Sequence, residues 1–207
     1  MPSGQVQRAL EELGTTDADV VSLDPHSVEE ILASIVRAGR VLHREEEATD
    51  LVDKLQQRIE AVKATASRLP TIRAFALEWA DPPFVGGHWI PEMVQVAGGT
   101  NLLNEPNRPS VTVTWREIAD ASPEVVVFMP CGYYLEEAVD EAAKLFDQPE
   151  FASTPAARDG AVFAVDATSY FSRPGPRVVD GLEILAWAIH PDAFPESTAG
   201  AIQRVGR

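Results

Sequence analysis

Each of three apolar segments is followed by a loop that is rich in aromatic residues, proline and glycine; the segments are 72–79, 124–129 and 161–165. Seven side chains in these loops are suited to hold a large, flat, partly apolar ligand, because aromatic rings give flat contact and a histidine and an arginine add polar contacts. They are Phe84, His88, Trp89, Tyr133, Tyr170, Phe171 and Arg173. We predict that these seven residues form a ligand-binding site.

Cys131 offers a second kind of chemistry. It follows an expected strand and precedes an expected helix, and a thiolate is stabilised at a helix N-terminus. A cysteine-dependent enzyme is therefore one hypothesis. No sequence signature places a histidine beside Cys131, the common phosphate-binding, serine-hydrolase and zinc motifs are absent, and the four histidines lack ligand-like spacing. We expect a protein without catalytic residues and without a metal site.

The elements that position these loops alternate regularly after residue 71. Helices are expected at 89–97, 115–121, 134–146 and 177–189. Strands and helices in alternation predict the α/β class, with a Rossmann-like, mostly parallel sheet flanked by helices. Because the carboxyl ends of parallel strands share one edge of the sheet, we expect the three loops to meet there.

The N-terminal third of the chain has a different pattern. We expect a short strand at Asp19–Leu23 and helices at 5–13, 27–38 and 44–68. The helix at 44–68 carries a single apolar stripe, with charged residues on its other faces, and Leu69-Pro70 ends it. This long helix is expected to pack one side against the α/β region.

The composition excludes several classes of partner. There are 17 basic and 32 acidic residues, and the formal net charge of −15 disfavours binding to nucleic acid or to an anionic membrane. No apolar stretch approaches the roughly 18 residues that span a bilayer, so we expect no membrane insertion. The first residues lack the pattern of a secretory signal, and the chain as given is expected in the cytoplasm unless it is truncated at its N-terminus. One cysteine cannot form an intrachain disulfide.

Three stretches that occur in order carry a resemblance to a known family. They are DPPFVGGHWIPEMVQVAGGTNLL from Asp81, VTWREIADASPEVVVFMPCG from Val113 and YFSRPGPRVVDGLEILAWAIHP from Tyr170. Together they resemble the C-terminal lobe of the class III solute-binding proteins of ABC importers, which are the vitamin B12 and iron–siderophore binders. The cobalamin-binding branch is the most similar, and the resemblance covers about residues 20–191.

The resemblance implies a fold of two α/β lobes joined by one long helix, with the ligand in the cleft between the lobes. It implies that most of the first lobe is absent from this chain. The expected parts are a remnant of the first lobe at 1–43, the connecting helix at 44–69, the C-terminal lobe at 70–191 and a loosely structured tail at 192–207.

The resemblance also implies a function. It implies a non-catalytic solute-binding module of an ABC import system that binds a corrinoid (cobalamin) or a ferric siderophore as its transported ligand, with no covalently bound cofactor. The family is extracytoplasmic, at the periplasm or the cell surface. Tyr170 stands where the vitamin B12 binders usually have a tryptophan that packs on the corrinoid, and it keeps a flat ring. Ser172 stands where they have a glutamate that forms a salt bridge to the ABC permease, a bridge that serine cannot form.

A protein–protein interaction module is the alternative hypothesis. A missing first lobe would leave half of the cleft uncovered, and exposed apolar patches favour association. The partner would be a second copy of the chain, giving a homodimer, or a separate protein that supplies the first lobe.

Overall fold

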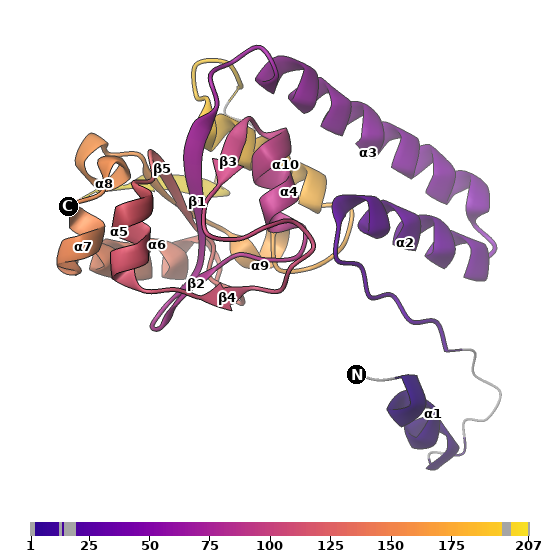
Figure 1. Cartoon of the computed structure of the whole chain (residues 1–207). Coiled ribbons are helices and arrows are strands. Elements are labelled where there is room, and N and C mark those ends of the chain that lie inside the picture. The colour runs from indigo at the N-terminus through magenta and orange to yellow at the C-terminus, as the bar shows by residue number, and fades with distance from the viewer. Residues whose placement is uncertain (1–2, 13, 15–19, 196–199, 207) are drawn as a thin grey trace.

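The computed structural model describes residues 3–12, 14, 20–195 and 200–206, and Figure 1 shows its layers. A seven-stranded sheet has the order β4-β2-β1-β5-β6-β7, and β3 also pairs with β1. The strands are β1 (Ile72–Ala80), β2 (Pro83–Val85), β3 (Gly99–Asn101), β4 (Val111–Thr112), β5 (Val125–Phe128), β6 (Val162–Val165) and β7 (Ile202–Val205). Helices flank the sheet, so the predicted α/β class with a mostly parallel, Rossmann-like sheet is confirmed.

The centre of the sheet consists of the three strands that the sequence predicts. β1 runs parallel to β5, and β5 runs parallel to β6. Every residue of β5 and β6 is buried, which is typical of strands covered by helices on both faces. The short strands β2, β4 and β7 pair antiparallel and lie toward the edges. The loops after β1, β5 and β6 therefore start from the same edge of the sheet.

Two apolar cores lie on opposite faces of the sheet, because successive strand side chains point to opposite sides. Ala74, Val127 and Phe163 belong to one core, and Phe75, Val126 and Phe128 belong to the other. The first core is covered by α4 (Ile90–Val96) and α10 (Val178–Ile189). The second is covered by α5 (Trp115–Ala121), α6 (Leu135–Lys144), the 3-10 helix Leu145–Asp147, α7 (Pro149–Ala152) and α8 (Pro155–Asp159). The short helix α9 (Ala167–Tyr170) follows β6.

A helical hairpin of α2 (Val28–Val41) and α3 (Glu45–Ala66) packs on the first core (Figure 1). Its turn is tight: a Cβ atom at Gly39 would lie 2.3 Å from the Ala48 side chain, so glycine is required there. Arg58 of α3 bonds Asp180 and Glu183 of α10 at 2.5 and 2.7 Å. The expected long helix thus runs across α10 and is tied to it by charge as well as by apolar contact.

Two expectations for the ends of the chain are wrong in part. Residues 20–23 form no strand, because none of the described strands pairs with them; Asp19 lies outside the described residues. The tail is more ordered than expected, since residues 202–205 form β7, which pairs antiparallel with β6 from Val162 to Val165. The amino-terminal helix α1 (Ser3–Glu12) stands apart from the sheet in Figure 1. Among the described residues, no helix is both long and apolar enough to cross a membrane.

Candidate functional site

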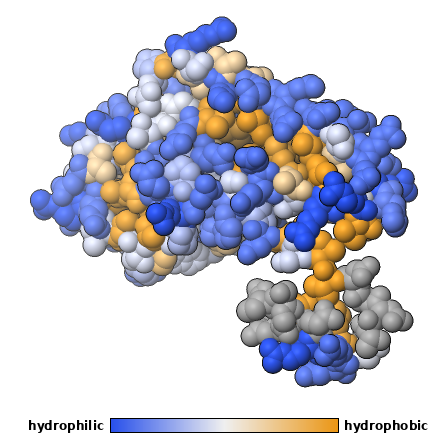
Figure 2. Space-filling model, turned by 45° about the vertical axis from the view of Figure 1, so that its right-hand side comes forward, coloured by the Kyte–Doolittle hydropathy of each residue, from blue (hydrophilic) through white to orange (hydrophobic). Residues whose placement is uncertain are grey.

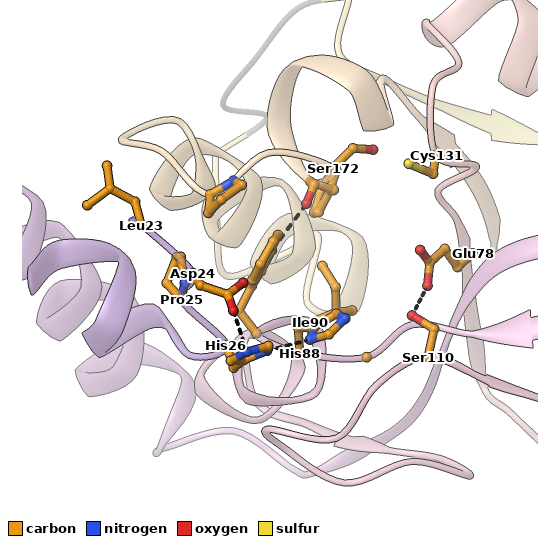
Figure 3. Close-up of a pocket in the computed structure, with 14 residues that line it drawn as sticks. Leu23, Asp24, Pro25, His26, Glu78, His88, Ile90, Ser110, Cys131 and Ser172 are labelled. Atoms are coloured by element: carbon orange, nitrogen blue, oxygen red, sulfur yellow. Dashed lines mark hydrogen bonds and ion pairs between the residues drawn. The ribbon is translucent and has the colours of Figure 1, made fainter. Parts of the chain in front are cut away.

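An open pocket of about 310 Å³ lies at the carboxyl edge of the parallel strands (Figure 3). Its lining combines the three strand-end loops with a part of the N-terminal segment that precedes α2. The lining residues are Leu23, Asp24, Pro25, His26, Glu78, Gly87, His88, Trp89, Ile90, Ser110, Cys131, Phe171, Ser172 and Pro174. The loops after β5 and β6 thus reach one pocket, where they meet residues 87–90, which follow β2; the turn directly after β1 is not among its lining residues.

The loop after β2 is held by close backbone contact with the loop before β4. The His88 N–H donates to the Arg108 carbonyl at 2.6 Å, and the Asn107 N–H donates to the His88 carbonyl at 3.1 Å. A Cβ atom at Gly87 would lie 2.2 Å from the Ser110 nitrogen, so only glycine allows this approach. His88 itself has φ 55°, a left-handed conformation that directs its ring into the pocket region.

The floor of the pocket is apolar. Trp89, Ile90 and Phe171 are all buried, and Trp89 retains 9% of its surface accessible. The Trp89 indole Nε1–H donates to the Phe171 carbonyl at 3.1 Å. This bond ties the loop before α4 to the loop after α9, so the two loops form one surface.

A first polar wall lies at the ends of β1 and β5. The Ser110 hydroxyl donates a hydrogen bond to the Glu78 carboxylate, and the thiol of Cys131 is exposed beside them. Figure 3 shows Glu78, Ser110 and Cys131 together on one side of the pocket, away from the labelled histidines. This wall offers a carboxylate, a hydroxyl and a thiol to a ligand.

A second polar wall comes from the N-terminal segment. The Nδ1 atoms of His26 and His88 lie 3.0 Å apart, and Asp24 lies 3.8 Å from Nε2 of His26. The segment is anchored where it enters α2: the Ser27 hydroxyl accepts from the Glu30 N–H, and the Glu92 carboxylate accepts from the Val28 N–H at 2.9 Å. A carboxylate at a helix N-terminus is stabilised by the helix dipole, so Glu92 fixes α2 to α4.

Three of the seven predicted ligand-binding residues line this pocket, namely His88, Trp89 and Phe171. Tyr133 lies instead at a separate pocket of about 170 Å³, where its ring meets Trp79 edge-on at 5.5 Å. The other three do not line the main pocket: they are Phe84 on β2, Tyr170 in α9 and the exposed Arg173.

Local packing explains why the rings of Phe84 and Tyr170 lie outside the pocket. The Phe84 Cα lies opposite Trp79 and Thr112, within the antiparallel edge of the sheet. The Tyr170 ring packs on the first core, with the guanidinium of Arg177 6.0 Å from its centre. Loop membership alone therefore does not fix which aromatic ring faces the cavity.

The sequence interpretation missed the wall formed by Asp24, Pro25 and His26. His26 and His88 are 62 positions apart, and no spacing rule joins them. The only local signal is that His26 directly precedes Ser27, the N-cap of α2, so that a capped helix orients it. Within the described residues, no group of three or more His, Cys, Asp or Glu side chains could hold a metal ion.

Comparisons with solved structures support the fold. A periplasmic heme binding protein from Pseudomonas aeruginosa matches with TM-score 0.77 and 22% identity over 98% of this chain and 73% of its own. An ABC transporter substrate-binding protein from Listeria monocytogenes EGD-e matches with TM-score 0.76 and 18% identity over 91% and 73%. The periplasmic vitamin B12 binding protein of Vibrio cholerae matches with TM-score 0.67 and 20% identity over 88% and 69%.

The chain is shorter than the proteins that it resembles. It spans 57% of a periplasmic binding protein from Veillonella parvula, with TM-score 0.69 and 19% identity over 80% of this chain. None of the curated proteins matches the sequence.

The match to a family model covers most of the chain. The model described as periplasmic binding protein matches residues 1–168 of the 207. Proteins of this family bind solutes and are not catalysts, in agreement with the expectation from the sequence and against a cysteine-dependent enzyme built on Cys131. The chain belongs to the periplasmic binding protein family.

Proposed function

We propose that the chain is the solute-binding module of an ABC import system and that the pocket at the strand ends receives a corrinoid or a ferric siderophore. The observation that carries this proposal is the apolar floor of Trp89, Ile90 and Phe171 between two polar walls, at the carboxyl edge of a parallel sheet. Family membership supports the general role. The names of the similar heme and vitamin B12 binding proteins support a metal-containing ligand.

The size of the pocket limits the expected affinity. Its volume of about 310 Å³ is at the lower end of the roughly 300–1,000 Å³ of sites that enclose a drug-sized ligand. A corrinoid is larger than such a ligand, so one face of it would stay in water. Each Å² of apolar surface left exposed forfeits about 25 cal/mol. We therefore expect a cobalamin dissociation constant weaker than about 1 µM, since the uncovered face contributes little.

A titration with cyanocobalamin tests the proposal, followed by calorimetry and by the absorption spectrum of the corrinoid. Ser172→Trp places a large ring at the pocket and is expected to abolish binding. Thr65→Trp is the matched control, because Thr65 lines another groove of similar volume, about 330 Å³, between α3 and the segment 193–195. If millimolar cobalamin gives no heat and no spectral change, the hypothesis that the ligand is a corrinoid is rejected.

The same variants test the siderophore reading. A ferric hydroxamate siderophore is titrated in place of cobalamin, with quenching of tryptophan fluorescence as the signal, because Trp89 forms part of the floor. Binding that Ser172→Trp removes and Thr65→Trp preserves would support a siderophore. Equal binding by both variants would place the ligand elsewhere on the protein.

Delivery to a permease is a separate question that centres on Ser172. The hydroxyl of Ser172 cannot form the salt bridge that the family glutamate provides, so we propose that this chain docks weakly on a permease or does not dock. Ser172→Glu tests this point: it is expected to increase binding to a permease of the same import system in a pull-down. An unchanged pull-down would show that the serine is not what limits docking.

An interaction module is the second candidate, and exposed apolar residues favour it. Val20, Leu23, Val41 and Leu42 are 39%, 46%, 46% and 69% exposed. Figure 2 shows hydrophobic surface along the segment that leads from the body of the protein toward α1. Such exposure favours association with a second copy or with a first-lobe protein. Sedimentation should then show mass that rises with concentration, whereas a monodisperse monomer at high concentration would contradict self-association.

A further inference from the structure

The histidine pair in the pocket has the geometry of two ligands on one metal ion. The Nδ1 atoms of His26 and His88 are 3.0 Å apart, and the ring centres are 5.1 Å apart with planes inclined by 33°. Nitrogen ligands lie about 2.0–2.1 Å from zinc, so two neighbouring ligands of one ion lie roughly 2.9–3.4 Å from each other. The observed separation falls in this interval. Each Nδ1 can direct a lone pair at a shared cation, whereas a hydrogen bond between them uses only one lone pair.

We propose that His26 and His88 together bind a transition-metal ion, ferric iron included, through their Nδ1 atoms. Imidazole nitrogen suits zinc, copper, nickel and iron. The ion would occupy the place of the hydrogen between the two Nδ1 atoms, and the ring that carried this hydrogen would hold its proton on Nε2 instead. This proposal rests on the proposed solute-binding function for the pocket, and it specifies the kind of solute.

Asp24 supports the assignment of ligand atoms. Its carboxylate lies 3.8 Å from Nε2 of His26, on the opposite side of the ring from Nδ1. A histidine that binds a metal generally directs its other ring N–H at a carboxylate or a carbonyl, which fixes the tautomer and raises the basicity of the ligand. Asp24 therefore favours the proton on Nε2 and leaves the lone pair of Nδ1 for the ion. Its role is that of a positioning residue.

The two rings are held by different parts of the fold. His88 is fixed by backbone bonds to Asn107 and Arg108. His26 follows the buried Pro25 and lies next to the N-terminus of α2, which Glu92 anchors. The backbone positions that carry both imidazoles are thus fixed before any ion arrives, which lowers the entropy cost of binding.

Two protein ligands are too few to enclose a bare ion. The described residues include no third His, Cys, Asp or Glu in a suitable group. Both histidines line the pocket of about 310 Å³, so a solute in this pocket would have to fill the remaining coordination positions. The inferred solute is a metal chelate with two neighbouring open positions. A corrinoid leaves open only the two positions on opposite faces of its ring, which adjacent imidazoles cannot share, so the pair favours an open-chain chelate of the siderophore type.

Nickel nitrilotriacetate is the test probe, because this chelate leaves two neighbouring positions open on the metal. The untagged protein is titrated by calorimetry as wild type and as His26→Gln and His88→Asn, in which asparagine tolerates the left-handed backbone of residue 88. We expect one chelate per chain, at least about 100-fold weaker binding in either variant, and about tenfold weaker binding in Asp24→Asn. His43→Asn is the control, since His43 is exposed at the turn after α2, has the same left-handed backbone and does not line the pocket.

The proposal is overturned if His26→Gln binds the nickel chelate as tightly as the wild type does. It is also overturned if His43→Asn loses as much affinity for the chelate as the two pocket variants lose. Residue 26 lies outside any helix or strand, so His26→Gln carries the test even if His88→Asn unfolds. Circular dichroism monitors the folding of every variant. If cobalamin and the siderophore do not bind but the nickel chelate still binds through both histidines, the proposed ligands are rejected and the histidine site stands. The reverse result would keep the proposed function and reject the histidine site.

Discussion

The two polar walls of the pocket are built in different ways. Glu78 and Cys131 sit at the ends of parallel strands, so the hydrogen bonds of the sheet place them. Asp24 and His26 belong to a segment without regular structure, and their positions depend on how the α2–α3 hairpin packs against α4 and α10. The pairing of the strands thus positions one wall, and the packing of the α2–α3 hairpin against α4 and α10 positions the other.

The difference suggests which wall can move. The strand-end wall is continuous with β5, every residue of which is buried, and with the buried centre of β1, so its local opening requires loss of the core. The N-terminal wall has exposed side chains and is held by a few specific contacts. We expect perturbations of the hairpin's attachment to loosen residues 20–27 and to leave Glu78 and Cys131 in place.

The largest effect is expected from Gly87→Val, which attacks the sheet-built part of the site. A Cβ atom there would lie 2.2 Å from the Ser110 nitrogen, so the two loops must separate. We expect a loss of about 2–3 kcal/mol in the free energy of unfolding, measured by urea denaturation. Gly175→Ala is the control, because nothing lies within 4 Å of its added Cβ. A Gly87→Val protein as stable as this control would refute the close-contact argument.

Arg58→Met is expected to have the next largest effect, because it removes the charged tie between α3 and α10. The carboxylates of Glu183 and Asp180, which hydrogen-bond to the guanidinium, raise the pKa of Arg58 above its usual range. The Arg58 side chain is 38% exposed, so solvent reduces the effect and we expect a loss of about 1 kcal/mol by thermal unfolding. Arg116→Met, at an exposed pair with Asp120, should cost about 0.3 kcal/mol. Equal losses in both variants would contradict a structural role for the tie.

Glu92→Gln should loosen the N-terminal wall with a small effect on stability. The carboxylate that accepts from the Val28 N–H becomes a neutral amide, which costs about 0.5 kcal/mol at a helix N-terminus. Hydrogen exchange should speed up at residues 20–30 and stay unchanged at Glu78 and Cys131. Faster exchange at both places would show that the two walls are not independent.

A pH dependence is expected where the end of α3 meets the end of α10. Burial lowers the pKa of His190, whose Nε2 atom lies against Gly98 beside Ala66. The folded state resists a proton that the unfolded state accepts near its ordinary pKa of about 6.5, so stability is lost as pH falls through and below that value. His190→Gln should lessen the fall in unfolding temperature between pH 7 and pH 5. If the unfolding temperatures of the wild type and of His190→Gln fall equally between pH 7 and pH 5, His190 is not the source of the pH dependence.

The sequence was sufficient for the three central strands of the sheet and for part of the site. Buried strands such as 124–129 and the amphipathic helix at 44–68 have strong local patterns, and the structure places both near the predicted bounds. The short strands β2, β3 and β4 were not predicted because two or three residues carry no periodicity. β7 was not predicted because only its pairing with β6 defines it.

The sequence predicted only those residues of the candidate site whose positions depend on residues nearby in the sequence. His88 and Trp89 follow from a glycine-rich loop next to a helix, which the sequence displays. The contact of His26 with His88 depends on the packing of the hairpin across 62 residues, and nothing local encodes it. Tyr133 and Tyr170 were expected in the pocket because both follow predicted strands. The position of a residue in a loop does not specify the direction of its ring, and neither residue lines the pocket.

Mapping of backbone chemical shifts by NMR tests most directly whether a solute lies between the two walls. The labelled protein is titrated with cyanocobalamin and with the diamagnetic gallium form of a hydroxamate siderophore. We predict that the largest shifts with at least one of them occur together at residues 23–26, at Glu78 and Cys131, and at the Trp89 indole. Shifts centred instead on the groove of Arg58 and Phe194, or no shifts with either ligand at millimolar concentration, would contradict the account.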